Sequence, residues 1–289
     1  LMQVESFIEE RPDSALTVLQ GMDKTELSGK EEEAKHALLL SMALDKNVID
    51  RTDFEVLQPA IDYYQNHGTA TDKLRTHYYE GRIYQNAGQG DLAMKSFIKA
   101  REVEGPITDT LTLGNLLVAQ ATYYYSTYKV KEFIANNQQA ARLYEAIGHS
   151  YYQFRSLLNT LDGSILNNDK PLADSILTCC RSEIEKHPDY EASLLSYILS
   201  YTITFGSDEE IRTAIESCLD KKNLSRNAKL KMALGYSKIG EAEKALQIFA
   251  EASPSNSLSY LAIQMQVLKS NEKYKEALDA YQSYSNTLE

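Results

Sequence analysis

The sequence is short of several residues and patterns that mark particular classes of protein. It contains no tryptophan, and its cysteines, Cys179, Cys180 and Cys218, are an odd number without CxxC pairs. Its five histidines are scattered and none belongs to an HExxH pattern, so we expect no metal site. Its longest nearly uncharged apolar run, 192–206, is shorter than the roughly 20 residues of a membrane-spanning helix. We therefore expect this segment to cross no membrane.

Positively charged residues are also fewer than negatively charged ones. Lysine and arginine number 30 against 41 aspartates and glutamates, which gives a net charge of -11. Such a surface repels phosphate backbones, so nucleic acid is not expected as a partner of this segment. No nucleophile–base set, phosphate-binding loop or dinucleotide fingerprint occurs either. With an ordinary 43% of apolar residues, the chain is predicted to be a folded, non-enzymatic protein without a cofactor.

What the sequence does contain is an internal repeat. Six residues recur at a displacement of 152 positions, and weaker copies recur in 40-residue steps. The six are Gly81, Tyr84, Gly88, Ala93, Phe97 and Ala100, matched by Ala233, Tyr236, Gly240, Ala245, Phe249 and Ala252. Apolar residues within each copy follow helical spacing, and strand signals are nearly absent. Cys180 and Cys218 fill the small-residue slot of their copies, so we expect them to be buried packing residues.

Turn residues mark where the predicted helices end. Gly88 fits the left-handed conformation that often closes a helix, and Ser207 with Glu210 is typical of a capping box. We predict an all-α fold, a right-handed α–α superhelix or helical solenoid of about seven helical hairpins in a single domain. The expected units are a partial one at 1–22 and full ones near 31–66, 71–104, 111–147, 150–187, 190–222, 225–253 and 256–288 of the domain 1–289.

Two of these units resemble a known family. The stretches "EGRIYQNAGQGDLAMKSFIKA" (80–100) and "ALGYSKIGEAEKALQIFAEASP" (233–254) look like tetratricopeptide repeats, with the small residue, the tyrosine, the turn glycine and the second-helix alanine and phenylalanine in place. The small residue lets two helices approach closely, and the aromatic side chain fills the space beside it. The resemblance implies a concave surface, lined by the first helix of each pair, that binds a protein or peptide.

The N-terminal third carries a narrower resemblance. The stretches 9–22 ("EERPDSALTVLQGM"), 36–50 and 57–68 resemble the opening of a large bacterial group of signalling tetratricopeptide proteins. Members carry an export or lipoprotein signal, this repeat domain, one transmembrane helix and a cytoplasmic output region. The resemblance implies an extracytoplasmic sensor or interaction domain, periplasmic and tethered to the inner membrane only through segments absent here. Because the sequence begins at Leu1 without an initiator methionine, we expect that a preceding segment was removed.

The predicted partner-binding surface is the concave groove. Projection of the first helices onto the repeat geometry places there Arg75, Tyr78, Arg82, Gln85, Asn86, Asn115, Thr122, Tyr125, Arg155 and Asn159. The arginines and tyrosines suit an acidic or carboxylate-bearing peptide, through forked hydrogen bonds and aromatic contacts. An alternative stays open, in which the arginines pair with Glu80, Glu102 and Asp162 on a solvated face.

The tyrosine-rich stretch "ATYYYSTYK" (121–129) divides by role, because successive residues of a helix rotate by about 100°. Tyr124 is predicted to belong to the core and Tyr123 to the seam between two units. Tyr128 replaces a turn glycine and is expected to pack at the end of the hairpin. Only Tyr125 is expected to project toward the groove.

Three functions follow from these patterns. The first is a non-enzymatic scaffold that binds a protein or peptide, as the sensor part of a bacterial membrane-tethered regulator. The second is a cytoplasmic regulator of the same repeat type that binds a small peptide or sugar and changes the curvature of the superhelix. The third, an enzyme with an unfamiliar site, has no motif in its favour.

Overall fold

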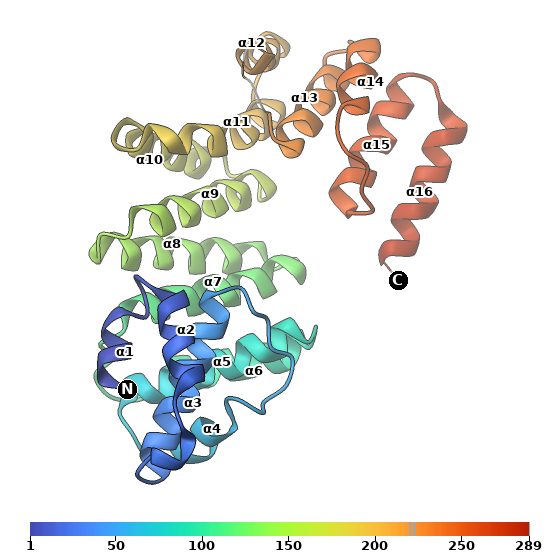
Figure 1. Ribbon diagram of the computed structural model, residues 1–289. Helices are drawn as coiled ribbons and strands as arrows, with labels where there is room; N and C mark the ends of the chain where they lie inside the picture. The colour runs from blue at the N-terminus through green and yellow to red at the C-terminus, as the bar shows by residue number, and fades with distance from the viewer. Residues whose placement is uncertain (220, 222–223, 289) are drawn as a thin grey trace. The chain divides into compact units, whose positions relative to one another are not determined.

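The computed structural model describes residues 1–219, 221 and 224–288. Across these residues the protein is all-α, as predicted: 16 α-helices and two short 3₁₀ helices follow one another, without a strand (Figure 1). The chain divides into two compact units, 1–156 and 157–289. Position 222, where a predicted repeat ends, and position 289 lie outside the described residues.

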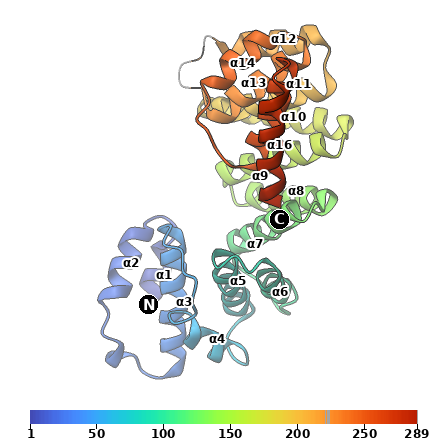
Figure 2. The ribbon, with the colours of Figure 1, turned by 90° about the vertical axis from the view of Figure 1, so that its right-hand side faces the viewer.

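The first unit is built from consecutive helices that pack in pairs. Its helices are α1 (Met2–Phe7), α2 (Pro12–Gly21), η1 (Lys24–Glu26), α3 (Lys30–Lys46), α4 (Gln58–Tyr64), α5 (Ala70–Asn86), α6 (Gly90–Arg101), α7 (Thr110–Ser126), α8 (Val130–Ala146) and the start of α9 (Ser150–Leu166). Figure 2 shows α1, α2 and α3 side by side, and α5 beside α6. α7 packs on α8, and the first helices α3, α5 and α7 also contact one another in order. This is the organisation of a helical solenoid.

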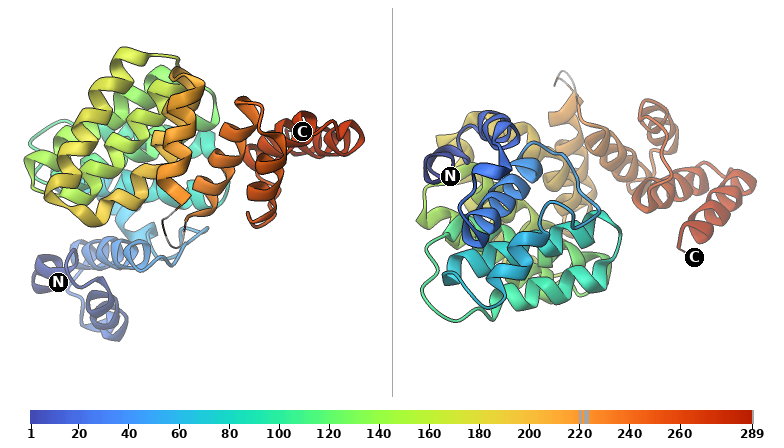
Figure 3. Two further views of the ribbon diagram at one scale, coloured as in Figure 1. Left: turned by 90° about the horizontal axis from the view of Figure 1, so that it is seen from above. Right: turned by 60° about the horizontal axis from the view of Figure 1, so that its bottom comes forward.

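The second unit is also built from consecutive helices. It contains the rest of α9, then α10 (Lys170–Lys186), η2 (Pro188–Tyr190), α11 (Glu191–Phe205), α12 (Asp208–Leu219), α13 (Arg226–Lys238), α14 (Ala242–Ala250), α15 (Leu258–Ser270) and α16 (Tyr274–Leu288). α13 packs on α14 and α15 on α16, and Figure 3 shows the last pair running side by side. None of the described helices combines the length and the apolar character of a membrane span.

The first helices end in the same way, one 40-residue step after another. Val48, Gly88, Tyr128 and Asn168 all have a positive φ, between 55° and 73°. In each case the following residue donates its backbone N–H to the carbonyl five residues earlier, at 2.8 to 3.0 Å. This is the left-handed helix end predicted for Gly88. Only Gly88 adopts it without crowding, because the other three residues carry a side chain.

Small residues let the helices of a pair approach closely. The Cβ atom that an alanine would add at Gly81 lies 2.3 Å from the Phe97 ring on the partner helix, so it does not fit without displacement. The small-residue slots of Ala100 and Cys180 are completely buried, and Cys218 is 1% exposed. Burial raises the pKa of the Cys180 thiol to about 12. The prediction that these cysteines are buried packing residues is confirmed.

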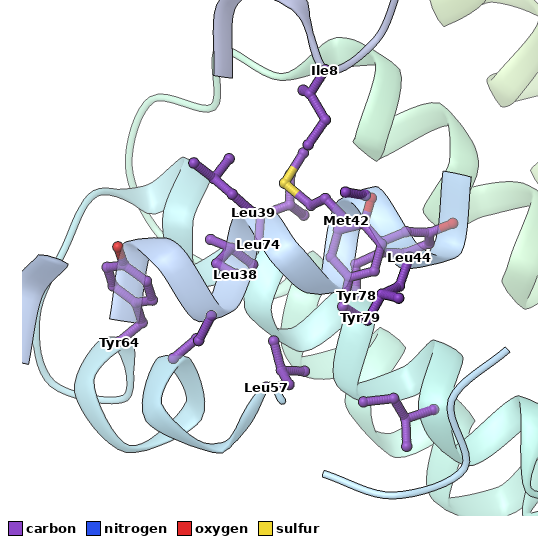
Figure 4. Packing of buried hydrophobic residues seen from close by; sticks show 14 of the residues in the cluster. Ile8, Leu38, Leu39, Met42, Leu44, Leu57, Tyr64, Leu74, Tyr78 and Tyr79 are labelled. Atoms are coloured by element: carbon purple, nitrogen blue, oxygen red, sulfur yellow. The ribbon is translucent and has the colours of Figure 1, made fainter. Parts of the chain in front are cut away.

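The core of the first unit holds α5 against the N-terminal helices. Figure 4 shows Leu38 and Met42 of α3, Leu74 and Tyr79 of α5, and Ile8 in one cluster of side chains, none of them more than 3% exposed. Leu38 and Met42 lie one helical turn apart, so α3 presents one apolar face to this cluster. The packing fixes α5 and therefore the side chains that α5 contributes to the predicted groove.

The tyrosine-rich stretch follows the prediction only in part. Tyr123 lies at a seam, as predicted, because its hydroxyl donates to Asp91 Oδ1 of the preceding pair at 2.6 Å. Tyr124 is half-buried rather than a core residue, and the Lys129 ammonium group lies 5.9 Å from its ring centre. The expectation that Tyr128 packs was wrong, since it is 76% exposed. It closes α7 beyond the last turn, where solvent surrounds it.

Candidate functional site

The predicted groove residues occupy recurring positions of the repeat. The first groove position comprises Lys35 on α3, Arg75 on α5, Asn115 on α7 and Arg155 on α9, each 40 residues after the last. The second groove position, seven residues further along each helix, comprises Arg82, Thr122 and Asp162. Equivalent positions of a repeat have similar backbones. Differences between them therefore come from the side chains that surround each one.

Arg75 is held between two carboxylates. Its Nη1 lies 2.5 Å from Glu5 Oε1, and its Nε lies 2.5 Å from Asp109 Oδ2. The side chains of Arg75 and Asp109 are only 15% and 8% exposed. Lys35 pairs in a similar way with Glu5 at 2.9 Å and with Asp72 at 3.3 Å. Both cations of the first groove position in α3 and α5 are therefore neutralised within the unit.

These ion pairs keep the carboxylates charged. Burial alone would raise the pKa of Asp109, but the Arg75 guanidinium and the hydrogen bonds from Thr112 lower it below its ordinary value. Burial also opposes ionisation of Glu5, and Lys35 and Arg75 together lower the pKa of that carboxyl. The ion pairs connect α1, α3, α5 and the start of α7, because Glu5, Lys35, Arg75 and Asp109 come from four different segments.

Arg82, Gln85 and Asn86 also make contacts inside the unit. The Arg82 guanidinium contacts Asp45 Oδ1 of α3 at 3.0 Å, and its Nη1 donates to Gln85 Oε1 at 2.6 Å. Asn86 Nδ2 donates to the backbone carbonyl of Arg51 at 3.2 Å. These three predicted groove residues thus join α5 to α3 and to the loop that follows α3.

A small pocket of mixed polar and apolar lining lies at the same place. It is lined by α3, the loop after it and α5, and includes Asp45, Arg82 and Asn86. Two buried polar atoms in its wall, Ser41 Oγ and Arg51 Nε, have no hydrogen-bond partner. Its volume is about 20 Å³, which is room for about one water molecule. The pocket is therefore too small for a peptide.

The alternative left open for the arginines is right only in that Arg75 and Arg82 form ion pairs, because their acidic partners are others and the pairs are largely buried instead of lying on a solvated face. Neither pairs with Glu80, because the Glu80 carboxylate contacts His77 Nδ1 at 3.2 Å instead. The sequence could not identify the true partners, since Glu5 and Asp45 lie 70 and 37 residues away from the arginines that they bind. Such distant pairs depend on how the helices stack.

Tyr78 does not face a groove. It is 5% exposed, and its ring centre lies 4.9 Å from that of Tyr79 and 6.1 Å from that of Phe97. Burial raises the pKa of its hydroxyl above the ordinary value. The prediction for Tyr78 is corrected: Phe97 of α6 packs against this side of α5, so the phenol belongs to the core.

Asn115 lies in a different environment, beside a row of aromatic side chains. Its Oδ1 accepts a hydrogen bond from the Tyr144 hydroxyl at 2.7 Å, and Tyr144 is 1% exposed. The Tyr144 ring centre lies 5.3 Å from that of Tyr152. Tyr152 in turn lies 4.8 Å from the His149 ring and 5.7 Å from the Tyr151 ring. Asn115 therefore holds the buried end of an aromatic row that reaches the surface at the start of α9.

Arg155 completes this row. Its guanidinium carbon lies 6.0 Å from the Tyr151 ring centre, and its Nη1 donates to the Tyr151 hydroxyl at 3.3 Å. Arg155 is exposed, as are Tyr151 at 50% and Tyr152 at 40%. In the part of the chain that the structure describes, no carboxylate forms an ion pair with Arg155. We call His149, Tyr151, Tyr152 and Arg155 the α9 cluster.

The remaining predicted residues are less distinctive. Thr122 is exposed and its hydroxyl donates to the Val118 carbonyl of its own helix at 3.1 Å. Tyr125 is 48% exposed and packs on Phe133, with ring centres 5.1 Å apart. Asn159 is half-buried on the part of α9 that belongs to the second unit. Of the predicted set, Asn115 and Arg155 are the two that the aromatic row joins.

The α9 cluster has the chemistry of a recognition surface. A guanidinium group can bind a carboxylate through two parallel hydrogen bonds, and tyrosine rings offer large, rigid contact areas. Among residues 1–219, 221 and 224–288, no group of histidine, cysteine, aspartate or glutamate side chains is placed to hold a metal ion. The arrangement therefore suits the binding of a partner with a carboxylate beside an aromatic or apolar group.

Sequence reasoning found Arg155 but missed His149, Tyr151 and Tyr152. The signal was present in the stretch "HSYYQFR" (149–155), where paired tyrosines come four and three positions before the arginine. Because residues four apart on a helix share a face, Tyr151 and Arg155 were bound to meet if α9 began at or before Tyr151.

Comparison with known proteins adds no relative. No protein-family model matches this chain, and no curated protein matches it. The resemblance to tetratricopeptide repeats therefore has no independent support from a family match. The coarser finding, an all-α array of packed helix pairs, stands on the structure itself.

Proposed function

We propose that the protein is a non-enzymatic scaffold that binds a protein or peptide through the α9 cluster. The observation that supports this function is the exposed Arg155 guanidinium, which rests on the Tyr151 ring without an ion pair among the described residues. Arginine and tyrosine are the residue types that carry much of the binding energy in protein interfaces. In a chain of net charge -11, a solvent-facing cation on an aromatic support favours an acidic segment of a partner.

The proposal places the partner at α9 rather than at α5. Arg75 and Arg82 are engaged by Glu5, Asp109 and Asp45. A partner carboxylate would have to displace these intramolecular pairs and leave an acidic side chain without its cation, which is costly at a largely buried site. Binding at Arg155 displaces no carboxylate of the described residues.

We further propose that the helix pairs are tetratricopeptide repeats and that the protein is the extracytoplasmic sensor or interaction domain of a bacterial membrane-tethered regulator in the periplasm. Support for the repeat type comes from the recurring helix end and from the close contact of Gly81 with Phe97. Support for the location comes from the N-terminal sequence resemblance alone. A fusion of the full-length protein to a reporter that is active only outside the cytoplasm tests the location.

The binding function can be tested with charge reversal at the α9 cluster. The full-length protein is purified under native conditions from its own cells, and the proteins that accompany it are quantified by mass spectrometry. We expect Arg155→Glu to reduce recovery of the partner at least tenfold, because it replaces the attracting cation by a repelling anion. Tyr152→Ala, which removes aromatic contact area, is expected to have a smaller effect in the same direction.

Arg142→Glu is the matched control for this experiment. Arg142 is also exposed in the first unit and lies on α8, so its reversal changes the net charge by the same amount at another place. Recovery that is unchanged in Arg142→Glu and lost in Arg155→Glu supports the proposal. If Arg142→Glu and Arg155→Glu recover the same amount of partner and both keep the thermal stability of the wild type, the proposal is contradicted.

A further inference from the structure

A cavity lies between α3 and the segment that leads into α4 (Figure 2). It has a volume of about 270 Å³. One wall is a single face of α3, formed by residues three and four positions apart: Glu33, His36, Ala37 and Leu40. Val56 and Pro59 form the opposite wall. The cavity is therefore built within one helix pair of the first unit, and it involves no residue of the α9 cluster.

The next helix pair has larger polar side chains at the equivalent place. Forty residues further along the chain, His77 takes the position of Ala37 and Lys99 that of Pro59. His77 Nδ1 contacts Glu80 Oε2 at 3.2 Å. Burial alone would raise the pKa of Glu80, but the hydrogen bond with His77 and the charge of Lys99 lower it. Where the α5–α6 pair has an imidazole and an ammonium group beside a carboxylate, the smaller residues of the α3–α4 pair leave a space.

His36 gives this space an unused hydrogen-bond acceptor. The side chain is 3% exposed, and its Nε2 lies 2.9 Å from the Leu19 carbonyl oxygen. A carbonyl only accepts, so Nε2 carries the proton, and Nδ1 of the neutral ring is an acceptor. Nδ1 has no hydrogen-bond partner among the described residues, and it keeps some contact with open space, which is the cavity that His36 lines. A largely buried acceptor of this kind favours a ligand that donates a hydrogen bond.

The charged groups around the cavity are carboxylates. The exposed Glu33 lies at the mouth and forms no ion pair with any described residue. Glu55 also lines the mouth, although it contacts Arg51 Nη2 outside the cavity at 3.7 Å. The described part of the wall contains neither lysine nor arginine. The electrostatic potential at the mouth is therefore negative, which favours a cationic ligand.

We propose that this cavity binds a small primary amine whose body is an apolar ring. The ammonium group donates to His36 Nδ1 and lies beside Glu33, and the ring packs on the apolar residues of the two walls. The α5–α6 pair supports this choice, since an ammonium group, an imidazole and a carboxylate come together there at the equivalent place. The site is separate from the α9 cluster, so the inference goes beyond the function proposed above.

The volume of the cavity fits a ring better than a chain. A protein cavity of about 150 Å³ binds benzene, so about 270 Å³ holds a ring together with a short chain and its ammonium group. The lysine side chain of a partner protein would leave part of this volume empty, and the walls would lose packing contacts. A free amine with one ring therefore matches both the volume and the polar groups of the cavity.

The probe for this proposal is 2-phenylethylamine, and 2-phenylethanol is the matched neutral ligand. Their binding to the whole chain is measured by isothermal titration calorimetry at neutral pH. We expect the amine to bind saturably and the alcohol to bind at least tenfold more weakly, because the alcohol lacks the charge that the carboxylates attract. Glu33→Gln should weaken binding of the amine at least fivefold and leave binding of the alcohol unchanged. Glu132→Gln, an exposed position on α8, makes the same charge change elsewhere and should affect neither ligand.

The His36 ring reports the contact directly. In protein labelled with nitrogen-15 at its histidines, the amine should shift the Nδ1 resonance of His36 but not that of His77, whose Nδ1 already contacts Glu80. Ala37→Met fills the cavity without changing its charge and should abolish both the binding and the shift. If Ala37→Met disturbs folding, Glu33→Gln keeps the test decisive, because it changes only an exposed side chain.

Several results would overturn the proposal. One is the absence of saturable binding of 2-phenylethylamine, and another is equal affinity for the amine and the alcohol, which would mean that the ammonium group is not recognised. A shift at His77 without a shift at His36 would place the ligand elsewhere. Binding of n-butylamine, which copies a lysine side chain, as tightly as 2-phenylethylamine would assign the cavity to a partner's lysine instead of a free amine with a ring.

Discussion

Arg75 and Arg155 occupy the same position of the repeat, two 40-residue steps apart, yet their surroundings differ completely. Arg75 is 15% exposed and lies between Glu5 and Asp109. Arg155 is exposed and rests on Tyr151. The difference arises because segments distant in sequence supply the carboxylates around α5. The position in the repeat therefore determines where a side chain leaves its helix. The neighbouring helices determine which contacts that side chain makes.

The second groove position shows the same contrast. Arg82 on α5 is paired with Asp45. Asp162, its equivalent on α9, has no ion-pair partner among the described residues, and burial raises the pKa of its carboxyl despite the attraction of Lys231 on α13. The charges of α5 are thus satisfied internally, whereas those of α9 are not. We infer that α5 uses these positions for stability and α9 uses Arg155 for binding.

Replacement of Arg75 and of Arg155 tests the difference between α5 and α9 with the largest expected effect. Arg75→Met leaves the Glu5 and Asp109 carboxylates without their shared cation, and we expect the free energy of unfolding to fall by about 3 kcal/mol. Arg155→Met removes a surface side chain and should change it by less than about 0.5 kcal/mol. Urea unfolding of both variants beside the wild type measures this. Similar losses in the two variants would contradict the division of roles.

Charge reversal at the second groove position gives the next largest effect. Arg82→Glu places a carboxylate beside Asp45, and we expect a loss of about 2 kcal/mol, because the ion pair becomes a repulsion in a partly buried place. The double variant Arg82→Glu, Asp45→Arg restores opposite charges and should recover part of this loss. Thermal unfolding followed by circular dichroism compares the two. A double variant no more stable than Arg82→Glu would count against the Asp45 contact.

Low pH should weaken the ion pairs that Asp109 and Glu5 form with Arg75 of α5. The folded state lowers the pKa of Asp109 and Glu5, so their contribution is complete above the ordinary carboxyl pKa of about 4 and is lost as the pH falls below it. We expect the free energy of unfolding to decrease between about pH 5 and pH 2. The decrease should be shallower in Arg75→Met, which lacks the cation responsible. Urea unfolding at several pH values gives both slopes, and equal slopes would argue against Arg75 as the cause.

Asp162 should respond in the opposite direction. Because its pKa is raised in the folded state, the charged carboxylate costs stability above that pKa, and the cost disappears on protonation at low pH. We expect Asp162→Asn to increase the free energy of unfolding by about 0.5 kcal/mol at pH 7 and to have no effect at pH 3. A gain of the same size at both pH values would indicate a cause other than ionisation.

The fold was largely predictable because its determinants are local. Helical spacing, the glycine at position 88 and the small residues facing Phe97 all act within one hairpin. The left-handed ends at Val48 and Tyr128 were harder to recognise, because neither residue favours a positive φ. They adopt it since the hairpin connection requires it at every 40-residue step.

The candidate site was predictable only in outline. Position in the repeat placed both Arg155 and Tyr78 in the concave groove, and Arg155 is exposed whereas Tyr78 lies in the core. The reason is that a periodic pattern gives the direction of a side chain from its own helix. It does not show which other helix covers that side, and contacts such as Glu5 with Arg75 form across 70 residues of sequence.

The most direct test of the account is site-specific crosslinking in living cells. Tyr152→p-benzoyl-phenylalanine places a photoreactive ring in the α9 cluster, and the same replacement of Tyr128, which is 76% exposed on α7, is the control. We predict that light links the protein to one defined partner from position 152, not from position 128, and that Arg155→Glu abolishes the product while Arg142→Glu does not. Products of equal yield from both positions, or a product from position 152 that survives Arg155→Glu, would contradict the central claim.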